Sequence, residues 1–365
     1  MARRELLQLG HTYQPDKHTI AGFYVSEKLD GTRCFWDGGL SRGCVTAAVP
    51  YASVLDPKTG RRKAKIKPVA TGLWSRYGNP IMAPDWFLNR LPCCPLDGEL
   101  WAGRGNFQLC RSICAGDAPD ERFDQIQYAV YSTPPLPQVF CDGEIKNANM
   151  LREINRARIE TWVRDRATDL PDFVCVDPTA TFDDELLFLR EMIPSQDDRV
   201  FMHQQFKLPH DEAAAKATAD AFLQRVLDKG GEGIVLRDPA ATWRPKRVKS
   251  LLKYKPFEDA EAVVTGFVAG KEGKQGNVLG KIGALKFKWG NVEFEIGSGM
   301  TMAQRELHGS DARLHAVAHP GDELPSGFHG KHFQLGQVIT FKYRELSDDG
   351  VPKEARYWRK RDAVE

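Results

Sequence analysis

The segment "SEKLDGTRCFW", Ser26 to Trp36, decides how the first part of this chain folds and what it can do. Apolar residues in the segment favour a β-strand, yet Lys28, Asp30 and Arg33 crowd around an Asp-Gly pair. Asp-Gly is a turn signal, so the pattern predicts a turn that presents Lys28 at the end of a strand. A strand does not need these charges in order to fold, and we therefore expect them to serve a site.

The bulk composition is that of a folded protein rather than of a disordered or highly charged one. The chain has 365 residues, 42% of them hydrophobic and 27% charged, which is enough for two domains or one large one. Its formal net charge of +2 excludes a polycation. Eight cysteines occur without a CxxC pair, which argues against a zinc ribbon and suits reduced thiols.

One local run of charge is strong enough to need an explanation. Residues 58–67, "KTGRRKAKIK", hold six basic residues and no acidic one. Such a run is either a solvated loop or a contact for phosphate groups, and the sequence leaves both interpretations open.

No part of the sequence has the character of a membrane segment. The N-terminal residues "MARRELLQLGHTYQPDKH" lack the apolar stretch of a secretory signal. No apolar run approaches the roughly 20 residues that cross a bilayer. We therefore expect a cytoplasmic protein with no membrane partner.

The secondary-structure pattern predicts an α+β first domain. Short strands with Gly and Asp turns dominate the first 140 residues, and "QYAVYS" (127–132) alternates like a strand. The spacing turns helical from about 143 to 195, and residues 211–229 are strong helix formers that end at Gly230-Gly231. The next segments predict a strand over 232–239, a basic loop over 244–249 and a strand over 251–256.

The remaining residues differ in their secondary-structure pattern, and they predict a second domain. Four short strands with Gly-rich turns and little helix signal follow residue 257: "AVVTGFVAG", "IGALKFKWG", "VEFEIGSGM" and "VITFKYREL". About 110 residues of mostly strands suit a small β-barrel. We expect a first domain over 1–257 and an all-β domain over 258–365.

Four separate segments carry charged residues that strands do not need for folding. The first holds Lys28 and Arg33, and the others hold Glu99 in "LDGELW", Glu232 in "GGEGIVLRD", and Lys253 and Lys255 in "LLKYKP". Each residue alone has a structural explanation, as a turn carboxylate, a strand cap or the solvent face of a half-buried strand. Together they are harder to explain without a shared site.

Nucleotidyl transfer is a chemistry that uses all of these groups. A neutral lysine amine can attack the α-phosphorus of a nucleotide and hold it as a phosphoramidate, and nearby cations favour the neutral amine. Glu99 and Glu232 would hold a metal ion through hard oxygen ligands. Arg33, Lys253 and Lys255 would neutralise the charge on the phosphates.

The order of these segments resembles the covalent nucleotidyltransferases, which comprise ATP-dependent DNA ligases, RNA ligases and mRNA capping enzymes. "SRYGNP" (75–80) is similar to an element that follows the lysine motif in DNA ligases. "SEKLDGTRCFWDG", "LDGELWAGRGNFQ", "FEIGSGMTMAQRE" and "ITFKYRELSDDGVP" resemble small bacterial and phage ATP-dependent DNA ligases. The resemblance covers nearly the whole chain.

The resemblance implies an α+β fold with two domains. The first is a nucleotidyltransferase domain, which is an ATP-grasp-like adenylation domain of antiparallel sheets and helices. The second is an OB-fold domain. The resemblance also implies Lys28 as the nucleophile that carries AMP, with ATP and Mg²⁺ (or Mn²⁺) as cofactors and nicked duplex DNA as the partner of a monomer in a bacterial or phage-infected cell. The remaining expected ATP-binding residues are Glu27, Arg33, Glu99, Tyr131, Glu232, Lys253 and Lys255, with Glu99 and Glu232 as metal ligands. The expected DNA-binding residues are Arg33, Arg42, Arg76, Arg61, Arg62, Lys63 and Lys65.

Tyr131 is the best match to the aromatic residue that stacks on adenine in the family, and Tyr128 is its nearest competitor. Two segments depart from the small bacterial relatives: about 30 extra residues at roughly 42–71, and an extra stretch at 308–332. "RYWRKRD" near the C-terminus matches the basic end motif of larger ligases only loosely. An RNA ligase, an mRNA capping guanylyltransferase and a non-catalytic DNA-end binding protein remain as alternatives to a nick-sealing DNA ligase.

Overall fold

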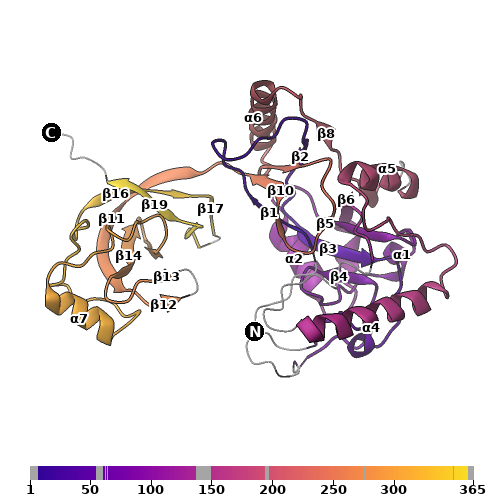
Figure 1. The fold of residues 1–365 in the computed structure, drawn as a ribbon, viewed down its shortest axis with the longest axis horizontal. Helices are drawn as coiled ribbons and strands as arrows, with labels where there is room; N and C mark the ends of the chain where they lie inside the picture. Colours follow the sequence, from indigo (N-terminus) through magenta and orange to yellow (C-terminus); the bar gives the residue numbers. More distant parts are fainter. Residues whose placement is uncertain are drawn as a thin grey trace. The chain divides into compact units, whose positions relative to one another are not determined.

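The computed structural model divides into two units, residues 1–254 and 255–365 (Figure 1). The structure describes residues 7–54, 61, 63, 65–136, 149–193, 197–273, 276–347 and 349–360. The division lies three residues before the expected boundary, because the chain leaves the last strand of the first unit at Tyr254.

Two five-stranded sheets form the frame of the first unit. One has the order β1-β10-β9-β2-β8, and the other has the order β4-β3-β5-β6-β7. The strands of the first sheet are β1 Leu9–Thr12, β10 Arg247–Tyr254, β9 Ile234–Arg237, β2 Tyr24–Glu27 and β8 Phe206–Lys207. The strands of the second sheet are β4 Leu73–Ser75, β3 Thr32–Asp37, β5 Pro95–Trp101, β6 Gln127–Ser132 and β7 Val200–Met202.

The helices of this unit cover the outer faces of the sheets. They are α1 Asp85–Leu88, α2 Phe107–Ala115, α4 Asn149–Ala167, α5 Phe182–Met192 and α6 Glu212–Asp228, with short 3₁₀ turns at Thr46–Ala48 and Glu121–Gln125. Apolar residues of α6 such as Leu223 pack on Val25 and Leu236 of the first sheet. The second sheet is covered on one face by α2 and α5, whereas Ile159 of α4 shares a cluster with Phe35 on the other. Both sheets are therefore buried on the faces that hold their large apolar residues.

The residues between β2 and β3 carry the chain from one sheet to the other. β2 ends at Glu27 and β3 begins at Thr32, so Lys28 lies where the two sheets meet. Gly31 is required in this crossing, because a Cβ there would lie 2.3 Å from the backbone oxygen of Leu100. The Asp-Gly pair thus lies in a short connection between strands of two different sheets, and it is not the turn of a hairpin.

The second unit is built around one five-stranded antiparallel sheet with the order β15-β14-β11-β16-β19. Its strands are β11 Glu258–Ala269, β14 Ile282–Trp289, β15 Val292–Ile296, β16 Val338–Tyr343 and β19 Arg356–Lys360. Two short hairpins pair β12 Glu272–Gly273 with β13 Gly276–Asn277 and β17 Glu345–Leu346 with β18 Pro352–Lys353. The expected α+β fold followed by an all-β domain is confirmed.

Three details differ from the expectation. β10 begins at Arg247, inside the stretch expected to be a loop, because Leu9 of β1 pairs with it. The helical stretch at 143–195 is two helices, α4 and α5, and residues 143–148 lie outside the described part. The extra stretch at 308–332 contains a helix, α7 Ser310–Ala318, which the pattern did not indicate.

Candidate nucleotide-binding site

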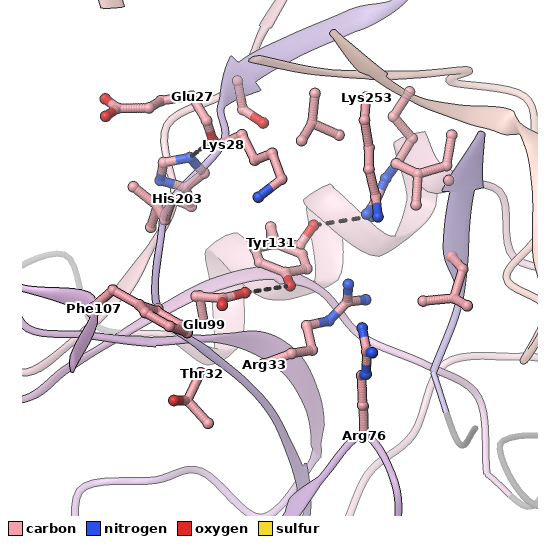
Figure 2. A pocket seen from close by; sticks show the side chains of 18 of the residues that line it. Glu27, Lys28, Thr32, Arg33, Arg76, Glu99, Phe107, Tyr131, His203 and Lys253 are labelled. Atoms are coloured by element: carbon pink, nitrogen blue, oxygen red, sulfur yellow. Dashed lines mark hydrogen bonds between the residues drawn. The ribbon is translucent and has the colours of Figure 1, made fainter. Parts of the chain in front are cut away.

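A cavity of about 530 Å³ is lined by residues from both sheets of the first unit. Its wall includes Lys28, Arg33, Glu99, Tyr131 and Lys253. Figure 2 shows these side chains converging around the ring of Tyr131. The structure therefore brings together five residues that the sequence placed in one site.

The position of each group follows from strand register. Arg33 of β3 lies directly opposite Glu99 of β5, so both side chains leave the same face of the second sheet. In the first sheet, Val235 pairs with both Ser26 and Lys253, so these three residues share a face. One face of each sheet therefore supplies these polar side chains to the cavity, and on β3 the same face continues into the buried Phe35.

A bulge aims Tyr131 at the site. The register between β5 and β6 passes from the Asp97–Ser132 pair to the Gly98–Val130 pair, which leaves Tyr131 as the extra residue. Its hydroxyl donates a hydrogen bond of 3.3 Å to Glu99 Oε2 (Figure 2). Tyr128 is instead fully buried, and its hydroxyl donates to the backbone oxygens of Cys34 and Leu96.

Lys28 is in direct contact with Glu232. The Lys28 Nζ donates a hydrogen bond to Glu232 Oε2, and both side chains are largely buried. The backbone nitrogen of Lys28 also donates to the Gly233 oxygen at 2.8 Å. The segment "GGEGIV" therefore holds Lys28 through both its backbone and its side chain.

The ionisation of Glu99 is sensitive to its surroundings. Burial raises the pKa of Glu99 from 4.5 to about 7, and the charges of Lys28 and Arg33 act in the opposite direction. The pKa of Lys253 is lowered to about 8, first by burial and then by repulsion from Lys28 and Arg247. The site thus holds more positive charge than it can neutralise by itself, as expected where anionic phosphates bind.

Arg33 is held by a carboxylate that the sequence reasoning missed. Its Nε and Nη2 donate to the two oxygens of Asp97 at 2.6 and 2.7 Å, and Asp97 is completely buried. The guanidinium lies 4.8 Å from the centre of the Tyr131 ring. Arg33 is thus a fixed cation beside the cavity, and the signal for its partner was the aspartate two residues before Glu99 in "LDGELW".

Sequence reasoning also missed two polar residues of the wall, His203 and Arg237, and the partner of Glu27, Arg104, which does not itself line the cavity. Arg104 donates to both carboxylate oxygens of Glu27 at 2.7 and 2.6 Å, so Glu27 lines the cavity already paired. His203 lies 2.9 Å from the Glu27 backbone oxygen through Nε2. Arg237 packs 5.7 Å from the Tyr131 ring centre. The glycine-flanked Arg104 in "WAGRGNF" was the one visible signal for these residues.

The other predicted residues divide between several places. Arg76 lines the cavity and stacks on Tyr77, with 4.6 Å from the guanidinium carbon to the ring centre. Lys255 belongs to the second unit, where its Nζ lies 3.9 Å from Glu345. Arg42 donates to Asp85 and Asn89 at 2.7 Å each, away from the residues that line the cavity.

The extra segment at roughly 42–71 is partly built into the fold. Tyr51 is buried and donates to Asp37 Oδ2 at 2.7 Å. Lys63 Nζ donates to Ser53 Oγ and Asn79 Oδ1 at 2.9 and 2.7 Å, whereas Lys65 is exposed. Arg61 is exposed as well, and Arg62 lies outside the described residues.

The donor set suits a hard divalent cation. Glu99 and Glu232 both lie beside Lys28, and a cation would restore the charge of a carboxylate whose pKa is raised by burial. Mg²⁺ binds through one or two carboxylates together with waters and substrate phosphates. A cluster of three or more His, Cys, Asp or Glu residues suited to a metal does not occur in the described part of the chain.

Comparison with known proteins adds sequence and fold similarity to this geometry. Residues 272–361 match the model of the DNA ligase OB-like domain. The chain is 25% identical over 355 residues to a DNA ligase of Haemophilus influenzae, covering 97% of this chain and 92% of that protein. A solved structure described as "DNA binding with a minimal scaffold: Structure-function analysis of Lig E DNA ligases" is 25% identical, with a TM-score of 0.58, over 97% of this chain and 98% of that one.

A second relative matches over a shorter stretch. It is a probable DNA ligase of Streptomyces griseus, 31% identical over 158 residues, which is 40% of this chain and 27% of that protein. No helix among the described residues combines the length and the apolar character needed to cross a membrane.

Proposed function

We propose that this chain, a member of the ATP-dependent DNA ligase family, works through an AMP held on Lys28 and seals nicks with a 5′-phosphate and a 3′-hydroxyl in duplex DNA. Family membership rests on the OB-like domain match and on the full-length similarity to DNA ligases. The observation that carries the residue assignment is the contact of Lys28 with Glu232, because Lys28 lines the cavity together with Glu99 and Arg33. The steps below assign roles to the residues of that cavity.

In the first step, the Lys28 Nζ attacks the α-phosphorus of ATP. A phosphorus–nitrogen bond forms, the bond to the bridging oxygen breaks, and pyrophosphate leaves with that electron pair. Glu232 lies in hydrogen-bond contact with Nζ and is therefore placed to orient the amine and take its proton. The ring of Tyr131 is the proposed stacking partner of adenine, because Tyr131 lines the cavity and Tyr128 does not.

The fixed cations stabilise the charge on the phosphates. Arg33 is held by Asp97 in one orientation, and Lys253 reaches the cavity from the other sheet. A cation fixed before the substrate arrives costs no reorganisation when charge develops. Glu99 and Glu232 are the residues that would hold Mg²⁺ (or Mn²⁺), which supplies further neutralisation of the phosphate oxygens when bound.

In the later steps, the AMP moves from Lys28 to the 5′-phosphate at the nick, and the phosphorus–nitrogen bond breaks. The 3′-hydroxyl then attacks that phosphate, and AMP leaves as the new phosphodiester bond forms. Holding both DNA ends beside one phosphate makes the joining effectively unimolecular, which is the main contribution that a ligase makes here.

DNA contacts are assigned to basic residues of the cavity wall and of the extra segment. Arg33 and Arg76 line it and can reach DNA phosphates after the nucleotide has reacted. The extra segment at roughly 42–71 contributes Arg61, Arg62, Lys63 and Lys65, and Arg42 lies at its start. Lys255 stays a proposed nucleotide-binding residue on the strength of the sequence motif alone. We further propose a monomer, which acts in the cytoplasm of a bacterial or phage-infected cell because its substrates are DNA and ATP.

A labelling experiment tests the assignment. Wild type and Lys28→Ala are incubated with ATP labelled at the α-phosphate, with Lys17→Ala as a control for an exposed lysine outside the cavity. We expect label on wild type and on the control and none on Lys28→Ala, with nick joining lost in parallel. Label on Lys28→Ala at the wild-type level would refute the assignment.

The same assay separates the alternatives. Preference for GTP over ATP would favour a capping guanylyltransferase, and preference for nicked RNA would favour an RNA ligase. A protein that binds nicked DNA but never takes label would be a non-catalytic DNA-end binding protein.

A further inference from the structure

A second hollow, of about 800 Å³, adjoins the nucleotide cavity. It is lined by the extra segment, by the "SRYGNP" element and by the end of α2. Among the described residues, its charged lining consists of Lys63, Lys65, Lys67, Arg111 and Asp117, which is four cations and one carboxylate. We call this region the basic hollow, and its charge balance favours an anionic ligand.

The cations of the basic hollow are partly fixed in place. Lys63 Nζ is held by Ser53 and Asn79, and Lys67 Nζ donates to the Pro80 oxygen at 2.9 Å. Half-burial lowers the pKa of Lys67, and the charge of Asp117 acts in the opposite direction. Side chains already ordered in this way lose less entropy when a ligand binds.

One group in the wall lacks a partner that a ligand could supply. Thr46 lines the basic hollow and is 1% exposed, and its hydroxyl has no hydrogen-bond partner among the described residues. A buried hydroxyl without a partner costs free energy, and native proteins seldom keep one. The Thr46 backbone nitrogen donates to the Pro68 oxygen at 2.9 Å, so this part of the extra segment is packed firmly into the wall.

The basic hollow and the nucleotide cavity share part of their walls. Thr32, Ser75, Tyr77 and Arg111 line both. The basic hollow and the nucleotide cavity are therefore neighbours on the first unit, close enough for one extended molecule to contact the walls of both. DNA strands that meet at a nick have this form, because each carries regularly spaced phosphates away from the reacting end.

We propose that the basic hollow binds backbone phosphates of one of the two DNA strand segments that meet at the nick, and so fixes that strand relative to Lys28. This inference rests on the proposed function. It assigns phosphate contact to Lys67, the last cation of the basic run at 58–67, and it adds Arg111, which the sequence did not single out. It also gives the extra segment a role as one wall of a strand-binding groove.

The test compares two double variants that remove equal charge. Lys65→Met with Lys67→Met empties the basic hollow of two cations. Lys17→Met with Lys216→Met is the matched control, because Lys17 is exposed like Lys65 and Lys216 Nζ donates to a backbone oxygen like Lys67. Affinity for nicked duplex DNA is measured from about 50 to about 200 mM salt, where each phosphate contact contributes a slope of about −0.9 in log affinity against log salt.

We expect the basic-hollow variant to have a slope that is shallower by about 0.9 to 1.8, and the control to keep the wild-type slope. Labelling of Lys28 by ATP should be unchanged in both variants, because that step needs no DNA. An unchanged slope in the basic-hollow variant, or an equal change in both variants, overturns the proposal. Failure of wild type to take label or to join nicks would instead refute the proposed function.

Competition identifies the source of the phosphate. Inorganic phosphate and pyrophosphate are added to wild type and to the basic-hollow variant during nick binding. If the basic hollow holds DNA, these small anions compete weakly at millimolar concentration. If pyrophosphate competes strongly and the variant loses labelling by ATP, the basic hollow belongs to the nucleotide site and the proposal is wrong.

Discussion

Replacing Glu99 with glutamine should make the protein more stable at pH 8 while it removes most of the joining activity. Burial raises the pKa of this carboxyl from 4.5 to about 7, even though Lys28 and Arg33 lie nearby. The folded protein therefore holds the charged form of Glu99 at a cost in free energy. Glutamine keeps the shape and can still accept the hydrogen bond from Tyr131, but it carries no charge.

The size and the sign of the effect follow from proton linkage. Below pH 4.5 the carboxyl is protonated in both states, so the cost is absent. As pH rises from 4.5 to about 7, the folded state binds more protons than the unfolded state, and the free energy of unfolding falls. At about 1.36 kcal/mol for each pH unit, the cost reaches an upper limit of about 3.4 kcal/mol above pH 7.

Urea denaturation at several pH values from 5 to 8, without metal, measures this prediction. The stability difference between Glu99→Gln and wild type should grow across this range and become constant above pH 7. Glu191→Gln is the control, because Glu191 is an exposed carboxylate of the same unit. A difference that stays flat with pH, or one that favours wild type at pH 8, would refute the reasoning. Retained nick joining by Glu99→Gln would separately show that its charge is not needed.

Two further predictions concern buried groups. Asp97→Asn should lower the free energy of unfolding by about 3 kcal/mol, because it leaves the Arg33 guanidinium without its carboxylate, and adding Arg33→Met should restore part of the loss. Urea denaturation of the single and double variants checks this, and fully additive losses would contradict it. Thr46→Val should leave the midpoint of thermal denaturation unchanged or raise it, because the buried hydroxyl has no partner in the described residues. A loss of more than about 1 kcal/mol would show that the hydroxyl is bonded within the folded protein.

Local signals predicted several elements of the fold from the sequence alone. The helix former run at 211–229 became α6, with the Asp211 side chain accepting from the Ala214 nitrogen at 2.8 Å. Gly230 follows with a φ of +75°, which a glycine adopts readily at the end of a helix. The turn signal after Lys28 was also local, since the chain must leave β2 and enter β3 within four residues. Signals of this kind depend on neighbours in the sequence, which is why they could be recognised there.

Other features depend on partners far away in the chain. The Asp97 that holds Arg33 is 64 residues from it, so although "LDGELW" shows the aspartate, neither strand alone shows that the two residues pair. Helix α7 was missed because its buried face consists of small residues such as Ala312 and Ala316, whereas Leu314 and Val317 are exposed. Its apolar pattern therefore did not mark the face that packs.

The same dependence on distant partners governs when the nucleophile becomes competent during synthesis. Lys28 contacts a carboxylate 204 residues further along the chain, and Lys253 of the cavity follows later still. During synthesis, Lys28 is therefore added to the chain long before Glu232 and Lys253, the residues that lie around it in the folded protein. Contacts between residues so far apart in the sequence form slowly during folding. We therefore expect Lys28 to be unreactive towards ATP until β9 and β10 have joined their sheet. On the proposed role of Lys28, uptake of AMP requires the first unit to have folded, so labelled ATP would measure the rate of that folding in a refolding experiment.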